Sequence, residues 1–320
     1  MLYSEVIIAG GGPAGSSCAW KLNQSGIQTI ILDKKRFPRS KLCAGWITPK
    51  AIKNLKISEK EYPYTLLTFK QLNFHFYGIK IPVRTRQFSI RRYEFDDWLV
   101  KRSGASVYQH TVRKIRKERS GYVIDNRFRC RYLVGAGGTN CCVYRTFFKQ
   151  ANPRSRKRRI LALEEEFKYD YHDENCYLWF FENNLPGYFW YLPKGNGYLN
   201  VGIGGNFTST KNKGETIRRH WNYFINKLEK LSLIKNYHFS PRSYNYYLKQ
   251  AAENVQSDNL FIVGDAAGLA TADMGEGIGP AVESGILAAN AIINGSEYSI
   301  RSINKYSFFD ILFPWRASSQ

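Results

Sequence analysis

Three glycines near the start of the chain have the spacing of a phosphate-binding turn. Gly10, Gly12 and Gly15 form a G-x-G-x-x-G pattern, and Asp33 ends the second apolar run that follows. In such a turn the first glycine allows the tight bend, the second lets backbone N–H groups approach a pyrophosphate, and the third lets a helix pack closely on a strand. An acid at the position of Asp33 accepts hydrogen bonds from ribose hydroxyls. Together these residue types predict a dinucleotide site.

The elements around the turn are those that this chemistry needs. An apolar run at 6–9 predicts a buried parallel strand, residues 16–25 predict a helix, and residues 28–32 predict a second strand. The N-terminus of that helix would place partial positive charge on the phosphates. A glycine-rich turn without a ligand is the alternative, but the flanking strand, helix and acid favour the dinucleotide. The position of the pattern at the start of the chain favours FAD over NAD by analogy.

Helix and strand signals interleave along the rest of the chain. Helices are expected at 94–102, 214–230 and 277–293. Strands are expected at 66–83, 106–115, 121–125, 131–134, 164–169, 177–181, 189–193, 198–203 and 260–263. The order predicts an α/β protein in which a mostly antiparallel β substrate domain interrupts a Rossmann-type FAD-binding domain, with a ligand cleft between them. The expected boundaries are 1–65, 90–160 and 250–295 for the FAD-binding domain, 66–89 and 161–249 for the substrate domain, and 296–320 for a short tail.

Composition limits the class of protein. An apolar share of 43% with 15% aromatic residues excludes a disordered chain, and no apolar run is long enough to predict a membrane-spanning helix. The six cysteines have no metal-ligand spacing, so we predict no metal site and expect free thiols. Because the first strand signal begins at residue 6, we see no room for a signal peptide and expect a cytoplasmic protein.

The charge is strongly positive. The chain has 47 Lys and Arg against 26 Asp and Glu, a formal net charge of +21. Such a balance suits an anionic ligand, an anionic membrane surface or nucleic acid. Cationic residues cluster at 34–41, 113–119, 127–131 and 154–159. The densest cluster, 154–159, is either a solvated loop or a place where the protein meets an anionic membrane peripherally. Nucleic acid is the weakest of these hypotheses, because no nucleic-acid module accompanies the charge.

Four blocks of sequence resemble the geranylgeranyl reductase branch of the FAD-dependent oxidoreductases, in the superfamily of p-hydroxybenzoate hydroxylase. The glycine unit is the first block, and residues 37–45 (FPRSKLCAG) resemble that branch's Pro-Arg-x-Lys-x-Cys-Gly-Gly segment. Residues 186–193 (PGYFWYLP) are close to its Tyr-x-Trp-x-Phe-Pro signature. The fourth block combines 264–268 (GDAAG) with 275–279 (GEGIG). The resemblance covers nearly the whole chain.

The resemblance implies roles for single residues. Asp33 would contact the adenosine ribose of FAD, Val112 would meet the adenine through its backbone, and Asp265 would bind the ribitol. Gly277 and Ile278, at a helix N-terminus, would donate N–H groups to the flavin C2 carbonyl. The full cofactor set that the resemblance implies is Gly10, Gly12, Ala14, Gly15, Asp33, Lys41, Cys43, Ala44, Gly45, Arg92, Val112, Asp265, Gly275, Gly277 and Ile278.

The sequence departs from the family pattern in places. Residues 135–138 (GAGG) lack the superfamily's Asp-Gly, which puts the usual nicotinamide and pyrophosphate contacts of that segment in doubt. In the family a proline usually precedes the Gly-Glu-Gly segment, but here residues 272–274 (ADM) precede it. Cys43-Ala44-Gly45 replaces the family's Cys-Gly-Gly. The electron donor stays open between NAD(P)H and a ferredoxin-like protein, and the oligomeric state stays open as well.

The implied reaction is reduction of a C=C bond in an isoprenoid or lipid-like substrate, with hydride from reduced flavin and a proton from the protein. Cys43 is the candidate proton donor, and Tyr188, Trp190 and Tyr191 are candidates for apolar walls whose aromatic faces stabilise transient positive charge. Ordinary packing is the alternative for all four residues. An FAD-dependent monooxygenase of aromatic or lipid substrates, and a basic flavoprotein that only binds a membrane surface, are the alternative functions.

Overall fold

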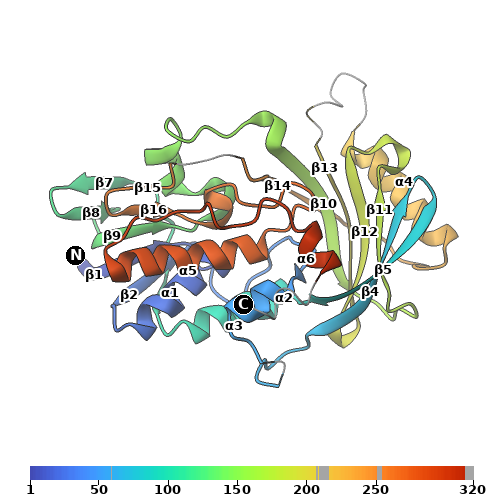
Figure 1. Ribbon diagram of the computed structural model, residues 1–320, viewed down its shortest axis with the longest axis horizontal. Coiled ribbons are helices and arrows are strands. Elements are labelled where there is room, and N and C mark those ends of the chain that lie inside the picture. Colours follow the sequence, from blue (N-terminus) through green and yellow to red (C-terminus); the bar gives the residue numbers. More distant parts are fainter. Residues whose placement is uncertain (59, 207, 209–215, 251–253, 314–320) are drawn as a thin grey trace. The chain divides into compact units, whose positions relative to one another are not determined.

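The chain divides into two compact units in a computed structural model, which describes residues 1–58, 60–206, 208, 216–250 and 254–313 (Figure 1). Unit 1 contains 1–40, 93–154 and 247–307, and unit 2 contains 41–92, 155–246 and the described residues from 308 on. Each unit has its own sheet of eight described strands, so the predicted α/β class with a Rossmann-type half is confirmed. The domain boundaries stay a prediction; they assigned 41–65 to the FAD-binding segments, whereas these residues lie in unit 2.

The sheet of unit 1 has a parallel centre. Its strands are β1 (Leu2–Ala9), β2 (Thr29–Asp33), β6 (Ser106–Gln109), β7 (Ile115–Glu118), β8 (Gly121–Ile124), β9 (Phe128–Gly135), β15 (Gln256–Ser257) and β16 (Leu260–Ile262). They run in the order β15-β16-β9-β1-β2-β6, with the β7–β8 hairpin joined to β9. The apolar second half of β1, residues 6–9, and all of β2 are buried, which is typical of parallel strands covered on both faces.

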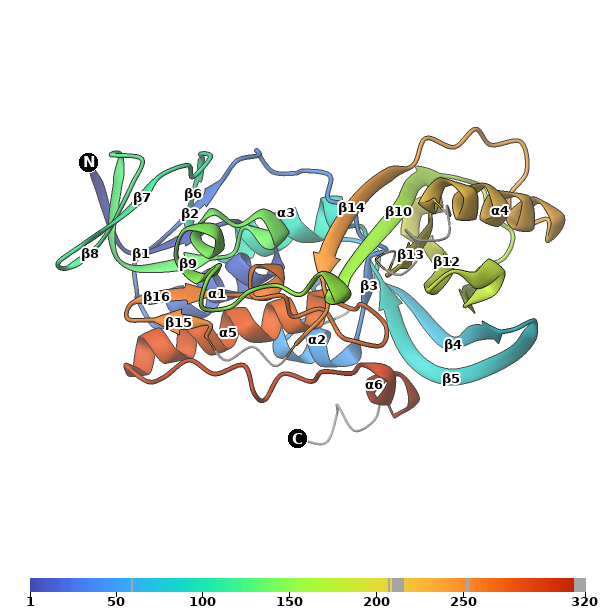
Figure 2. The ribbon, with the colours of Figure 1, turned by 90° about the horizontal axis from the view of Figure 1, so that it is seen from above.

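Two helices of unit 1 pack tightly against each other. Helices α1 (Pro13–Gln24) and α5 (Ile278–Asn294) lie side by side, as both ribbon views show (Figure 2). A Cβ atom at Gly285 of α5 would collide with the carbonyl oxygen of Ala14 in α1, so only glycine permits this approach. Helix α3 (Arg92–Arg102) follows β5 in the chain.

Unit 2 is built on a mostly antiparallel sheet. Its strands are β3 (Trp46–Ile47), β4 (Leu67–Phe76), β5 (Ile79–Ser89), β10 (Arg159–Lys168), β11 (Cys176–Phe180), β12 (Gly187–Lys194), β13 (Tyr198–Gly205) and β14 (Arg242–Tyr247). They run in the order β14-β10-β13-β12-β11-β4-β5-β3. The helices of this unit are α2 (Pro49–Asn54), α4 (Ile217–Lys230) and α6 (Phe308–Leu312). Helix α4 covers one face of the sheet, where the ring of its Phe224 stacks on Phe189 with centroids 4.9 Å apart.

The opposite face of this sheet carries the candidate aromatics Tyr188 and Trp190, whereas the third candidate, Tyr191, is packed in the core on the α4 side. In the strand register Trp190 lies opposite Gly202, and Gly202 lies opposite Glu164. Because residues directly opposite in an antiparallel pair share a face, these three positions form one row across β12, β13 and β10. The next row contains Tyr188 and Phe180, and Phe180 pairs with Phe76 of β4. We call Phe76, Phe180, Tyr188 and Trp190 the aromatic face; neighbouring ring centroids along it are 4.7, 5.1 and 5.9 Å apart.

Three secondary-structure predictions need correction. The single strand expected at 66–83 is wrong: it is the hairpin β4–β5, which turns at Tyr77 and Gly78, both with positive φ. Apolar residues alternate on both sides of the turn, but their phase changes between Phe76 and Ile79, and this change marks the hairpin. The strand expected at 106–115 ends at Gln109, so Val112 lies in an irregular segment before β7. Helix α4 begins at Ile217, and residues 214–215 of the predicted helix lie outside the described residues.

The remaining predicted elements are present near their expected positions. Of the helices that the structure describes, none combines the length and the apolar character needed to cross a membrane.

The position of the Trp190 ring predicts that alanine substitutions at two glycines of β13 differ in their effect on stability. A Cβ at Gly202 would enter the indole ring of Trp190, whereas a Cβ at Gly204 would lie in ordinary contact, 3.4 Å from Cζ3 of the same ring. We expect Gly202→Ala to lower the free energy of unfolding by about 1–3 kcal/mol, as overpacking does, and Gly204→Ala to leave it nearly unchanged. Urea unfolding of both variants measures this. Equal losses in the two variants would contradict the position of the indole.

Candidate functional site

The glycine turn of unit 1 has the geometry expected of a phosphate cradle. Gly10 has φ +121°, and a Cβ there would collide with the backbone of Ala136. The N–H of Gly11 donates to Oδ2 of Asp33 at 2.9 Å, so the acid at the end of β2 ties down the turn after β1. Gly12 faces open space except for a guanidinium nitrogen of Arg39, which would lie 3.6 Å from a Cβ there.

Arg39 is a site residue that the sequence analysis did not single out. Its guanidinium pairs with Asp96 at 3.2 Å and lies 3.9 Å from Asp33. Asp96 is fully buried, so this ion pair fixes the position of the cation beside Gly12. A fixed guanidinium next to a glycine turn suits a phosphate oxygen. The Pro-Arg segment of the 37–45 block was the available signal.

The second half of the candidate nucleotide site lies at the start of α5. Asp265 sits in the turn Gly264–Ala266 after β16, and its Oδ1 would lie 3.6 Å from a Cβ on Gly277, the residue that caps α5. Gly275 has φ +63°, a left-handed conformation that favours glycine in the turn just before α5. Glu276 accepts the N–H of Gly279 at 2.6 Å and so occupies one of the free donors of the first turn.

Arg154 is not part of a solvated basic loop. Its guanidinium donates to the carbonyl oxygens of Thr139 at 2.5 Å, Ala266 at 2.8 Å and Asp265 at 3.2 Å. The ring of Tyr144 lies 3.7 Å from its central carbon. Burial lowers the pKa of Arg154 from its ordinary value, and the carbonyls and the ring stabilise the charged guanidinium. Arg154 therefore braces the turn that carries Asp265.

Val112 is half-buried against the apolar core of unit 1, from the segment between β6 and β7. Its predicted backbone contact with adenine stays a prediction.

The predicted flavin-side residues of the 37–45 block lie in unit 2. Cys43 is half-buried, and its Sγ accepts the N–H of Gly45 at 3.4 Å. Gly45 has φ +75°, and a Cβ there would collide with Ile90 and with Lys194. The ammonium of Lys41 lies 5.0 Å from the centre of the Tyr244 ring. Ala44 is half-buried beside them.

Arg92, the predicted flavin-site arginine, is buried rather than a surface residue. Its role toward the cofactor stays a prediction.

Glu164 is the main residue that the sequence analysis missed. Only 2% of it is exposed, on the same sheet face as Trp190. Its Oε1 accepts the backbone N–H of Cys43, and its Oε2 has no hydrogen-bond partner in the described part of the chain. Burial raises the pKa of Glu164 to about 7, against the opposing influence of Lys194. Below about pH 7 this carboxyl is therefore mostly protonated, far above the range in which an ordinary glutamate keeps its proton.

Glu166 lies two residues farther along β10 and behaves in the opposite way. Burial alone would raise its pKa, but its ion pairs outweigh that and lower the pKa below its ordinary value. Its oxygens meet Nζ of Lys194 at 2.9 Å and Nε of Arg91 at 3.1 Å. Lys194 is fully buried and also donates to the carbonyl of Ile90 at 2.8 Å. Two neighbouring carboxyls are thus kept in opposite protonation states, a pattern that separates acid from base at catalytic sites.

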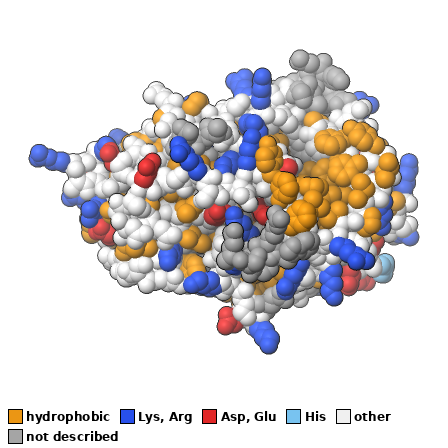
Figure 3. All heavy atoms as spheres, in the orientation of Figure 1, with side chains coloured by type: hydrophobic (Ala, Val, Ile, Leu, Met, Phe, Trp, Pro, Cys, Tyr) orange, Lys and Arg blue, Asp and Glu red, His pale blue; other side chains and the backbone are white. Residues whose placement is uncertain are grey.

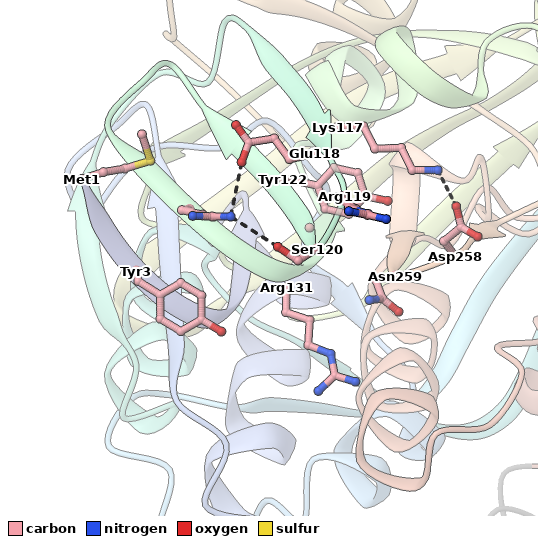
Figure 4. A pocket seen from close by; sticks show the side chains of 12 residues that line it. Met1, Tyr3, Lys117, Glu118, Arg119, Ser120, Tyr122, Arg131, Asp258 and Asn259 are labelled. Carbon is pink, nitrogen blue, oxygen red and sulfur yellow. Dashed lines mark hydrogen bonds and ion pairs between the residues drawn. The ribbon is translucent and has the colours of Figure 1, made fainter.

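A surface depression of unit 1 is lined by residues around the β7–β8 hairpin (Figure 4). Two of its cations pair with acids of the same lining: Lys117 lies 2.6 Å from Asp258, and Arg129 lies 3.5 Å from Glu118. It contains none of the predicted site residues, so we assign it no ligand.

The residues of unit 1 fit FAD. Among the described residues, no side chain caps the N-terminus of α1 by a hydrogen bond, and Gly12 leaves the approach to it open except for the Arg39 cation. A pyrophosphate needs backbone N–H groups and a cation at this place. At the start of α5, Gly277 leaves a similar opening beside Asp265.

Comparisons with known proteins agree with this geometry. A family model described as the FAD binding domain matches residues 3–56, and one described as the geranylgeranyl reductase catalytic domain matches residues 159–239. An uncharacterized protein of Methanosarcina barkeri is 34% identical over 90% of this chain and 74% of its own length. Digeranylgeranylglycerophospholipid reductase 1 of Methanosphaera stadtmanae is 26% identical over 96% of this chain and 80% of its own.

The fold is also that of a solved structure. A geranylgeranyl bacteriochlorophyll reductase-like protein of Thermoplasma acidophilum superposes with a TM-score of 0.79 at 22% identity, covering 92% of this chain and 79% of its own.

The buried carboxyl predicts a specific pH dependence of stability. Because the pKa of Glu164 is raised in the folded state, its favourable contribution is complete below its ordinary pKa of about 4.5 and is lost as the pH rises to about 7. We expect Glu164→Gln to gain stability relative to wild type across this window, by up to about 3 kcal/mol. Urea unfolding at several pH values measures the difference, with the exposed Glu229→Gln as control. A difference that is flat with pH would show that Glu164 is not buried in its neutral form.

Proposed function

The chain belongs to the geranylgeranyl reductase branch of the FAD-dependent oxidoreductases, and from this membership we propose that it reduces C=C bonds of an isoprenoid or other lipid-like substrate. The observation that carries the proposal is the juxtaposition of an aromatic face with the proton-holding carboxyl of Glu164. Both lie within the segment matched by the catalytic-domain model, apart from Phe76.

The aromatic face supports a long apolar substrate. Its four rings form a continuous strip across β4, β11 and β12. Such a strip offers an extended hydrophobic wall rather than a polar pocket for a small metabolite. The name of the Methanosphaera stadtmanae relative is that of a prenyl-lipid reductase, which agrees with this wall.

We propose that unit 1 holds the FAD. Gly12 and Ala14 would donate to the pyrophosphate beside Arg39, Asp33 would bind the ribose, and Asp265 would bind the ribitol. When bound and reduced, FAD supplies a hydride. We also propose the roles toward FAD that the family resemblance implies for the remaining residues of the predicted cofactor set.

The protein must supply the proton. Alkenes accept hydride poorly, so a proton must reach one carbon as hydride reaches the other. We propose that Glu164 stores this proton at its carboxyl near neutral pH, and that Cys43 orients the carboxyl through its N–H. Tyr244 keeps its own proton, because burial and then Glu164 raise its pKa well above the ordinary value. The indole of Trp190 is held by a 2.7 Å hydrogen bond to Asn200, so its face is fixed where positive charge would develop.

Peripheral contact with an anionic membrane remains part of this proposal, because a lipid-like substrate resides there. The electron donor remains open between NAD(P)H and a ferredoxin-like protein.

The test is an anaerobic assay. Chemically reduced holoenzyme mixed with digeranylgeranyl glycerophospholipid in detergent should reoxidise and yield a saturated product. We expect Glu164→Gln to slow reoxidation by about a hundredfold, the usual contribution of a positioned acid, while its FAD content and that of a Glu229→Gln control stay unchanged. A large loss in Cys43→Ser with Glu164→Gln unaffected would assign the proton to Cys43 instead.

No reoxidation by any prenyl substrate would refute the proposed function. Substrate-stimulated NAD(P)H oxidation that requires oxygen and yields a hydroxylated product would establish the monooxygenase alternative.

A further inference from the structure

The tip of the β4–β5 hairpin exposes large apolar side chains. Tyr77, Ile79, Ile81 and Phe181, which we call the hairpin tip, are 79%, 67%, 45% and 45% exposed. The rings of Tyr77 and Phe181 stack with centroids 6.3 Å apart. Figure 3 shows hydrophobic side chains gathered over the strands of unit 2. Single exposed apolar residues are normal on protein surfaces, but a contiguous group marks an interaction site.

The charged residues of the β4–β5 hairpin are all cationic. Residues 67–89, which form β4, the turn and β5, contain four Lys and Arg and no Asp or Glu. On β5 Lys80 lies between the exposed apolar residues Ile79 and Ile81, and Arg84 and Arg86 are exposed farther along the strand. Side chains of a strand point alternately to its two faces, so Lys80 and Arg84 point to the face opposite Ile79 and Ile81 and do not interrupt the apolar tip. Apolar residues flanked by Lys and Arg are the composition that binds anionic lipid surfaces.

The hairpin tip is continuous with the aromatic face. Ile79 lies opposite Phe76 in the hairpin, and Phe76 stacks on Phe180 with centroids 4.7 Å apart. From there the strip continues to Trp190, in the row of Glu164. A continuous row of aromatic rings thus leads from the exposed hairpin tip toward the carboxyl of Glu164, and two of its rings, Phe180 and Trp190, are themselves buried.

We propose that the hairpin tip inserts into the interface of an anionic lipid bilayer, with Lys80, Arg84 and Arg86 at the headgroup phosphates. This rests on the proposed lipid-like substrate, because the continuous strip would lead a prenyl chain from the bilayer toward Glu164. It also moves the membrane contact away from the 154–159 cluster, whose Arg154 is occupied inside unit 1.

Vesicle sedimentation of the full-length holoenzyme tests the proposal. Wild type should bind vesicles of phosphatidylglycerol and phosphatidylcholine, bind pure phosphatidylcholine weakly, and lose binding as salt rises. We expect the double variants Ile79→Ser with Ile81→Ser, and Lys80→Glu with Arg84→Glu, each to lose about tenfold or more in partition coefficient. Leu231→Ser and Lys230→Glu, exposed positions at the end of α4, are the matched controls and should bind like wild type.

Two outcomes would overturn the proposal. One is unchanged vesicle binding by both hairpin variants. The other is loss of self-association in size-exclusion chromatography with vesicle binding unaltered, which would assign the tip to a second copy of this chain.

A detergent-dispersed substrate separates this proposal from the proposed function. Lys80→Glu with Arg84→Glu should turn it over at the wild-type rate while failing on vesicles. If wild type turns over no prenyl substrate but the hairpin still directs vesicle binding, only the proposed function fails.

Discussion

The burial of the Glu164 carboxyl is the constraint on which the chemistry of unit 2 depends. One oxygen accepts the N–H of Cys43 and the other has no partner among the described residues. An ionised carboxylate in this position would lose its hydration without regaining it from the protein, so the protonated form is favoured. Glu166 stays ionised despite its burial because it forms ion pairs with Lys194 and Arg91. The face of the sheet therefore carries one stored proton and one fixed ion pair.

The geometry around the Glu164 carboxyl depends on a position of β13 that has no side chain. Gly202 stands between Glu164 and Trp190 in the register, and the space where its side chain would be is filled by the indole. A larger residue would push the indole away from its hydrogen bond to Asn200. The position of one aromatic ring over a glycine thus links the carboxyl to the aromatic face, and a backbone without that glycine would separate them.

The sequence predicted the parts of this protein that depend on local geometry. Gly10 needs a positive φ and Asp33 ends a buried strand, and both properties are visible in a few neighbouring residues. Glu164 could not be found in this way, because a glutamate in an alternating strand is ordinarily assigned to solvent. Its burial comes from a loop at Cys43 and a cross-strand glycine, which are distant in sequence. The turn at Tyr77 had a local signal, because the apolar positions change phase there from Phe74 and Phe76 to Ile79 and Ile81.

The cations behind the net charge of +21 fall into two groups, buried and exposed, with different roles. Part of it is internal: Lys194 is fully buried against Glu166, and the guanidinium of Arg154 is engaged by backbone carbonyls around Asp265. These cations position other groups and contribute little to the field that a distant partner meets. The cations of β5 are exposed on a segment without acids, beside apolar residues that water solvates poorly. A count of charges treats both kinds alike, and only their burial separates the cations that organise the site from those available to a membrane.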